Sequence, residues 1–146
     1  MCNRKTDWLS CVAMALVSVA VAGCGNEPLT MIVGTYTDEC ASRGVYSYFF
    51  DQEKGVITDG GGNIFTEAPG AVGRVEMRNP SYLTLSADGK FVYAVSEVGD
   101  SSASAVTLRL DSKTGEVQML GAELTDGKDP CYISTNGKVV MTANYS

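Results

Sequence analysis

One short motif occurs twice in the sequence, and this repeat limits the folds that the chain can adopt. The first copy spans residues 79–84 (Asn-Pro-Ser-Tyr-Leu-Thr), and the second spans residues 129–134 (Asp-Pro-Cys-Tyr-Ile-Ser). Each copy is followed by a turn that ends in Gly-Lys and then by a short run rich in strand-forming residues. Such runs are too short for helices, so each copy predicts a β-hairpin.

A second pair of similar segments alternates with the first. Residues 45–51 followed by Lys54-Gly55 match residues 105–111 followed by Thr114-Gly115. Two alternating hairpins give four strands in about 50 residues, which is the size of a β-propeller blade. The sequence therefore predicts an all-β fold, a β-propeller built from four-stranded antiparallel blades.

The repeats divide the chain into about two and a half blades. The second blade is complete, with strands predicted near residues 81–86, 90–97, 103–111 and 116–123. The first blade has predicted strands at 29–37 and 44–51. Its outer strand is expected within 56–68 and is interrupted by glycines 60–62. Residues 69–78 are predicted to connect this blade to the second. Its innermost strand has no match in the sequence, and a closed propeller could supply one from a distant C-terminus. We expect residues 30–146 to be the N-terminal part of a longer, seven-bladed propeller and to be aggregation-prone alone.

The N-terminal segment has the pattern of a bacterial lipoprotein signal. Two basic residues precede a run of apolar residues at 8–22, and the run ends in Val21-Ala22-Gly23-Cys24, which resembles a lipobox. We therefore predict a signal peptide over residues 1–23, lipidation of Cys24 and a tether over residues 24–29. The protein would be lipid-anchored in the cell envelope, facing the periplasm or on the outer membrane. A plain signal peptide or a membrane anchor with an incidental cysteine are the alternatives.

Charge and cysteine usage exclude several classes of partner. The net charge is −6 at pH 7, and no cluster of Lys and Arg is present, which argues against nucleic acid. The chain has no histidine and no Cys-x-x-Cys pair, so no metal site and no cofactor are expected. Outside the predicted signal and lipidation site, Cys40 and Cys131 remain, either as a disulfide or as two isolated thiols.

At the motifs that the repeats share, the chain resembles the lactonase family of seven-bladed β-propellers, the 6-phosphogluconolactonase-like proteins. The resembling segments are residues 33–37, 44–46, 79–83, 86–90, 129–131 and 143–146. The resemblance implies hydrolysis of a sugar lactone, although the same fold family includes a muconate-lactonizing enzyme. Family members usually carry a histidine after the Pro-Cys pair, where this chain has Tyr132.

Propeller geometry places the candidate site residues together. The start of a blade's first strand and the end of its second strand lie on the same face, near the channel mouth. This rim would hold Tyr36, Thr37, Asn79, Ser81, Glu97, Asp129, Cys131, Asn144 and Tyr145. Polar and aromatic groups that converge on a mouth suit a polyhydroxy ligand.

Lactone hydrolysis requires a base that activates water and a donor for the developing oxyanion. Glu97 is the candidate base, or else a glutamate that caps a turn. Arg74 and Arg78, with Arg43, could bind a phosphate or carboxylate, or be ordinary surface residues. Tyr36 and Tyr145 could stack on a sugar ring or belong to the blade cores. The remaining polar candidates for substrate binding are Asn79, Ser81, Asp129 and Asn144.

Two classes of function fit these residues. One is a lactone hydrolase; the other is a non-catalytic propeller scaffold that binds glycan or protein through the same rim. An envelope location and Tyr132 favour the scaffold, whereas the order and extent of the family-like segments favour the hydrolase. Much of the site would lie in further blades, so residues 1–146 alone are expected to be inactive.

Overall fold

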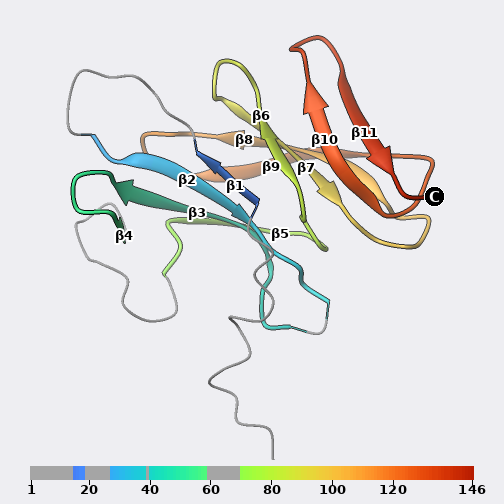
Figure 1. The fold of residues 1–146 in the computed structure, drawn as a ribbon, viewed down its shortest axis with the longest axis horizontal. Coiled ribbons are helices and arrows are strands. Elements are labelled where there is room, and N and C mark those ends of the chain that lie inside the picture. Colours follow the sequence, from blue (N-terminus) through green and yellow to red (C-terminus); the bar gives the residue numbers. More distant parts are fainter. Residues whose placement is uncertain (1–14, 19–26, 39, 59–69) are drawn as a thin grey trace, which may run out of the picture.

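The computed structural model describes residues 15–18, 27–38, 40–58 and 70–146, and all of the helix or strand structure in these ranges is β-strand. No helix within them is long and apolar enough to cross a membrane. The strands form three antiparallel groups (Figure 1). In chain order they are β1 (Ala15–Ser18), β2 (Leu29–Gly34), β3 (Gly44–Asp51), β4 (Val56–Thr58), β5 (Gly73–Glu76), β6 (Leu83–Leu85), β7 (Phe91–Ser96), β8 (Ser104–Leu110), β9 (Val117–Leu124), β10 (Pro130–Thr135) and β11 (Val140–Asn144). The all-β prediction is confirmed.

The second blade is a four-stranded sheet in the order β6-β7-β8-β9, as the sequence predicts. Along β8, alternate side chains from Ser104 to Leu110 are buried, because a strand directs successive side chains to opposite faces. The turn between β6 and β7 uses Gly89 at a φ of 69°, and the Gly89 N–H donates to the Ser86 carbonyl at 2.9 Å. Sequence pattern and turn chemistry therefore agree in this blade.

The first blade differs from the prediction in its outer strand. Strand β4 pairs with one end of β3 (Phe49↔Thr58), and β5 pairs with the other end (Ser47↔Gly73), both antiparallel. The two strands thus form one interrupted outer strand. The prediction that residues 69–78 are only a connection is wrong, because β5 restores the pairing and buries Val75. The predicted interruption at glycines 60–62 lies outside the described residues.

The innermost position of the first blade is occupied by β1. This strand pairs antiparallel with β2, from Ala15↔Gly34 to Ser18↔Met31, and it lies beside β6. The sequence predicts that residues 1–23 are a signal peptide and not part of the propeller. The pairing of β1 with β2 differs from that expectation. Its physical basis is the inner edge of β2, whose backbone groups form a ready template for any extended segment. The signal peptide and the tether stay predictions.

The hairpin of β10 and β11 begins the third blade and lies against β6 and β7. Between the first two blades, a shared core brings together buried apolar side chains from both sheets. Its members include Ile32, Val45, Val75, Leu83, Val92, Ala94, Val106 and Leu108. The blades approach so closely at Gly34 that a Cβ there would overlap the Pro80 carbonyl oxygen. This contact fixes the end of β2 beside the start of the second blade.

Candidate active site

The site is built from equivalent positions in successive blades. Tyr36, Glu97 and Tyr145 follow β2, β7 and β11, the second strands of their blades. The Glu97 N–H donates to the Asn79 carbonyl at 3.0 Å, and the Tyr145 N–H donates to the Asp129 carbonyl at 3.2 Å. Asn79 and Asp129 both have left-handed backbones, with φ values of 41° and 51°. The repeated geometry therefore brings the predicted rim residues to one end of the blades.

The Glu97 carboxylate is the centre of this group. Its Oε2 atom accepts a hydrogen bond from the Tyr36 hydroxyl at 3.0 Å and another from the Ser81 hydroxyl. Glu97 is half-buried, and its Oε1 atom accepts no hydrogen bond from the described part of the chain. One carboxylate oxygen is thus fixed by two donors, while the other can hold a water molecule.

The chemical state of Tyr36 supports this arrangement. Burial, followed by the hydrogen bond and the charge of Glu97, raises the pKa of Tyr36 above its ordinary value of 10.0. The phenol therefore stays protonated at neutral pH and donates to Glu97. The Tyr36 hydroxyl thus holds the carboxylate in one orientation, and stacking of the Tyr36 ring on a sugar stays a prediction.

Asn79, which the sequence predicts to bind substrate, is 6% exposed, and its side chain forms hydrogen bonds within the protein. Its Oδ1 atom accepts from the Thr37 N–H at 2.9 Å, the Thr37 hydroxyl at 3.2 Å and the Asp38 N–H at 3.1 Å. Its Nδ2 group donates to the Asp38 carboxylate at 2.9 Å and to the Glu97 carbonyl at 3.1 Å. Asn79 therefore connects the loop after β2 to the end of β7 and positions Tyr36 and Glu97.

The two arginines of the prediction occupy different places. Arg74 lies on the outer strand β5, where it forms an exposed ion pair with Glu76 at 3.4 Å. Arg78 immediately precedes Asn79 and forms ion pairs with Asp38 at 3.3 Å and Asp100 at 3.2 Å. Of these two arginines, Arg78 is the one that is hydrogen-bonded to the loops around Glu97 in the described part of the chain.

The remaining predicted residues lie towards the third blade. The Asp129 carboxylate lies beside Gly99, whose added Cβ would come within 3.2 Å of Oδ1. The Asn144 Nδ2 group donates to the Thr125 carbonyl at 3.4 Å, and its Oδ1 atom is buried without a hydrogen-bond partner among the described residues. Tyr145 is 77% exposed and contributes to the raised pKa of Tyr36. Asn144 thus packs against the connection between β9 and β10, next to Thr125 and Gly127, and substrate binding by Asn144 stays a prediction.

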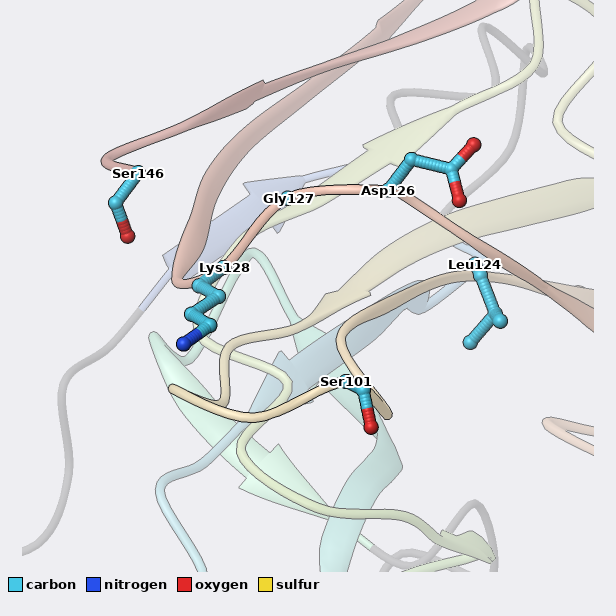
Figure 2. A pocket seen from close by; sticks show the side chains of 6 residues that line it. All are labelled: Ser101, Leu124, Asp126, Gly127, Lys128 and Ser146. Carbon is cyan, nitrogen blue, oxygen red and sulfur yellow. The ribbon is translucent and has the colours of Figure 1, made fainter.

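A cleft of about 500 Å³ lies next to these residues, between the loop after β7 and the connection from β9 to β10 (Figure 2). It is lined by Ser101, Leu124, Asp126, Gly127, Lys128 and Ser146. Figure 2 shows the charged ends of Asp126 and Lys128 pointing in different directions. This cleft was not predicted from the sequence, because its lining residues come from separate segments that meet only in the fold.

The cysteines and the tyrosine pair have local partners. Cys40 and Cys131 are free thiols, so the structure contains two isolated thiols and no disulfide between them. The Cys40 Sγ donates to the Tyr36 carbonyl at 2.9 Å. Tyr132 stands where a histidine was expected, and its ring lies 4.7 Å from the ring of Tyr82. These repeat-equivalent tyrosines pack the first strands of two blades together.

With this geometry established, the family model described as "Lactonase, 7-bladed beta-propeller" matches residues 30–146. The chain belongs to the lactonase family of seven-bladed β-propellers. Two solved structures share the architecture of this lactonase-family chain. A candidate 6-phosphogluconolactonase from Bacteroides fragilis is 40% identical over 85% of the chain, with a TM-score of 0.72. The periplasmic gluconolactonase PpgL of Pseudomonas aeruginosa is 31% identical over 80% of the chain, with a TM-score of 0.66.

The 6-phosphogluconolactonase of Bacillus subtilis is a curated relative, 30% identical over 77% of the chain. The match covers 29% of that relative and 31% of each of the two solved structures. The lactonase-family chain therefore spans less than a third of the length of these proteins.

Two site residues of this lactonase-family chain were missed by sequence reasoning. Asp38 and Asp100 lie in loops after β2 and β7, and both contact Arg78. No motif marks them, since exposed aspartates in loops are common. The repeat indicates only that both lie in the loops that follow the second strands of adjacent blades, and their offsets from Tyr36 and Glu97 differ by one residue.

Proposed function

We propose that the protein hydrolyses a sugar lactone and that Glu97 is the general base that activates water. The observation that supports this most directly is the Glu97 carboxylate, held through Oε2 by Tyr36 and Ser81 with Oε1 left for a water molecule. The names of the relatives, 6-phosphogluconolactonase and gluconolactonase, point to the same reaction class.

The proposed reaction is the hydrolysis of a cyclic ester. A water bound at Glu97 Oε1 gives a proton to the carboxylate as its oxygen forms a bond to the lactone carbonyl carbon. The carbonyl oxygen becomes an oxyanion in the tetrahedral intermediate, which hydrogen-bond donors stabilise. The bond between that carbon and the ring oxygen then breaks. The ring oxygen takes up a proton and becomes a hydroxyl, and the product is an open-chain sugar acid.

Ser81 and Tyr36 act by orientation in this proposal. A carboxylate that is held by two donors keeps one orientation. A base that is already oriented lowers the free-energy cost of alignment in the transition state. The Ser81 hydroxyl donates to Glu97 Oε2, so in this proposal Ser81 acts as a hydrogen-bond donor.

We also propose that the protein works in the cell envelope, anchored by a lipid on Cys24. The basis is the basic segment, apolar run and lipobox-like residues 21–24. A periplasmic relative, the P. aeruginosa gluconolactonase, is compatible with this compartment. An envelope enzyme would meet lactones of extracytoplasmic sugars.

The test is a hydrolysis assay at constant pH with the gene-encoded protein, meaning residues 1–146 and any residues that the gene encodes after Ser146. Glucono-1,5-lactone, its 6-phosphate, other aldonolactones and a muconolactone form the panel, and the spontaneous rate of each is subtracted. We expect a rate above background on at least one sugar lactone. Absence of any rate, together with measurable glycan binding, would instead favour the scaffold.

A further inference from the structure

We propose that Asp38 and Asp100 hold the Arg78 guanidinium and thereby restrict the site to uncharged sugar lactones, excluding phosphorylated ones. This inference rests on the proposed function and names its substrate class. It concerns Arg78, whose guanidinium is hydrogen-bonded to both loops beside Glu97.

The guanidinium of Arg78 is divided between two carboxylates. Its NH1 group donates to Asp100 Oδ2 at 3.2 Å, and its NH2 group donates to Asp38 Oδ2 at 3.3 Å. Recognition of a phosphate by arginine normally uses two parallel N–H groups directed at one ligand. Here the two groups point to different aspartates, so the fork is not presented to a single anion.

This ion cluster is connected to the proposed base. Asp38 Oδ2 also accepts from Asn79 Nδ2 at 2.9 Å, and that amide donates to the Glu97 carbonyl at 3.1 Å. The Ser96 hydroxyl donates to the Arg78 carbonyl at 2.9 Å. Arg78 therefore belongs to a hydrogen-bonded network that ends at the backbone carbonyl of the proposed base.

The charges around this network are mainly negative. Asp38 and Asp100 together cancel Arg78 and leave a net charge of about −1, to which Glu97 adds another. Hydrogen bonds from Ser102 and then Arg78 lower the pKa of Asp100 to about 2, so this carboxylate is ionised under all physiological conditions. Arg43 and Lys128 are exposed cations, and Asp126 and Asp129 lie near Lys128 in the sequence. A phosphate dianion would meet net repulsion here, whereas a neutral lactone would not.

The test compares kcat/KM for glucono-1,5-lactone and for its 6-phosphate in the gene-encoded protein and in Asp100→Asn. Asparagine keeps the oxygen that accepts from the Ser102 N–H at 2.8 Å, so the loop retains its turn while one charge is removed. Glu76→Gln is the matched control, because it removes the partner of Arg74 on the outer strand.

We expect the unsubstituted protein to prefer the uncharged lactone by about tenfold or more. Asp100→Asn should reduce this preference by about threefold to fivefold through a higher kcat/KM for the phosphorylated lactone. Glu76→Gln should leave the ratio unchanged. A preference of the unsubstituted protein for the phosphorylated lactone, or no change of the ratio in Asp100→Asn, would overturn the inference while leaving lactone hydrolysis intact.

Hydrolysis of neither lactone would instead count against the proposed function, and binding then decides the inference. Calorimetric titration would compare glucose with glucose 6-phosphate as probes. Stronger binding of glucose 6-phosphate to Asp100→Asn, by the same factor and without a change for glucose, supports the inference. Equal binding of glucose 6-phosphate to both proteins overturns it.

Discussion

The Tyr36 hydroxyl donates to Glu97 Oε2 at 3.0 Å, although the two residues are 61 positions apart and belong to different blades. This contact exists because the ends of β2 and β7 occupy equivalent places in adjacent repeats. A propeller thus assembles its site from one structural position that is occupied by different residues in successive blades. Tyrosine, glutamate and tyrosine stand there at 36, 97 and 145.

Two substitutions of Asn79 should distinguish the stability contributed by its side-chain hydrogen bonds from the cost of its left-handed backbone. Asn79→Ala removes the side-chain acceptor and donor. It also places alanine at a φ of 41°, which is unfavourable for a residue with a Cβ atom and no side-chain hydrogen bond. We expect the free energy of unfolding in urea to fall by about 3 kcal/mol. Asn79→Gly accepts the same φ and should lose about 1 kcal/mol less. Stability of Asn79→Gly equal to that of the unsubstituted protein would show that the hydrogen bonds contribute nothing.

Gly34 should be intolerant of any side chain. In Gly34→Ala the new Cβ overlaps the Pro80 carbonyl oxygen, and a backbone atom can move away only if the blades separate. We expect a loss of about 3 kcal/mol in the free energy of unfolding. Gly121→Ala on β9 is the control, because a Cβ there meets no atom within 4 Å. Equal stability of the two variants would contradict the close approach of the first two blades.

The sequence predicted the blade strands because turns and periodicity are local signals. Strands β3, β7, β8 and β9 begin and end within about two residues of the predicted bounds. Strand β5 was missed because a long insertion separates it from β4, and its partner β3 is reached only through pairing in space. The strand pairing of β1 was missed because its apolar residues match a signal peptide equally well.

The sequence predicted that several candidate residues lie close together, and the roles proposed for them stay predictions. Propeller geometry placed Asn79, Ser81 and Glu97 at one end, and the structure brings them together. Pattern alone could not show that Asn79 uses its amide internally, since that depends on the loop of the preceding blade. The positive charge of Arg78 is paired by Asp38 and Asp100 from two different loops, and no local motif indicates that these loops meet.

Tyr48 should make the protein sensitive to alkaline pH. Burial, with a smaller effect from Tyr46, raises the pKa of Tyr48 from 10.0 to about 12. The stabilisation from its neutral form is fully present below pH 10 and is lost as pH rises towards about 12, because the unfolded chain ionises first. Alkaline unfolding, followed by tyrosinate absorbance and circular dichroism, should move to higher pH in Tyr48→Phe. A shift as large in Tyr145→Phe, at an exposed position, would argue against this assignment.

Cys24 should carry the lipid if the proposed location is correct. Cells that express the gene-encoded protein would be labelled with a fatty-acid probe, and the protein would be recovered from the membrane fraction. Cys24→Ala should lose the label, whereas Cys11→Ala, within the predicted signal peptide, should keep it. Undiminished labelling of Cys24→Ala would place the modification elsewhere and remove the basis for the anchor.

The central claim is that Glu97 is the base, and kcat of Glu97→Gln on the best lactone of the panel tests it most directly. Glutamine keeps the shape and an oxygen that accepts from Tyr36 and Ser81, but it cannot take a proton from water. We expect kcat to fall by about 10²-fold or more with an unchanged circular dichroism spectrum. Glu123→Gln, on the exposed strand β9, should keep full activity. An unchanged kcat in Glu97→Gln would contradict the assignment and place the base on another residue.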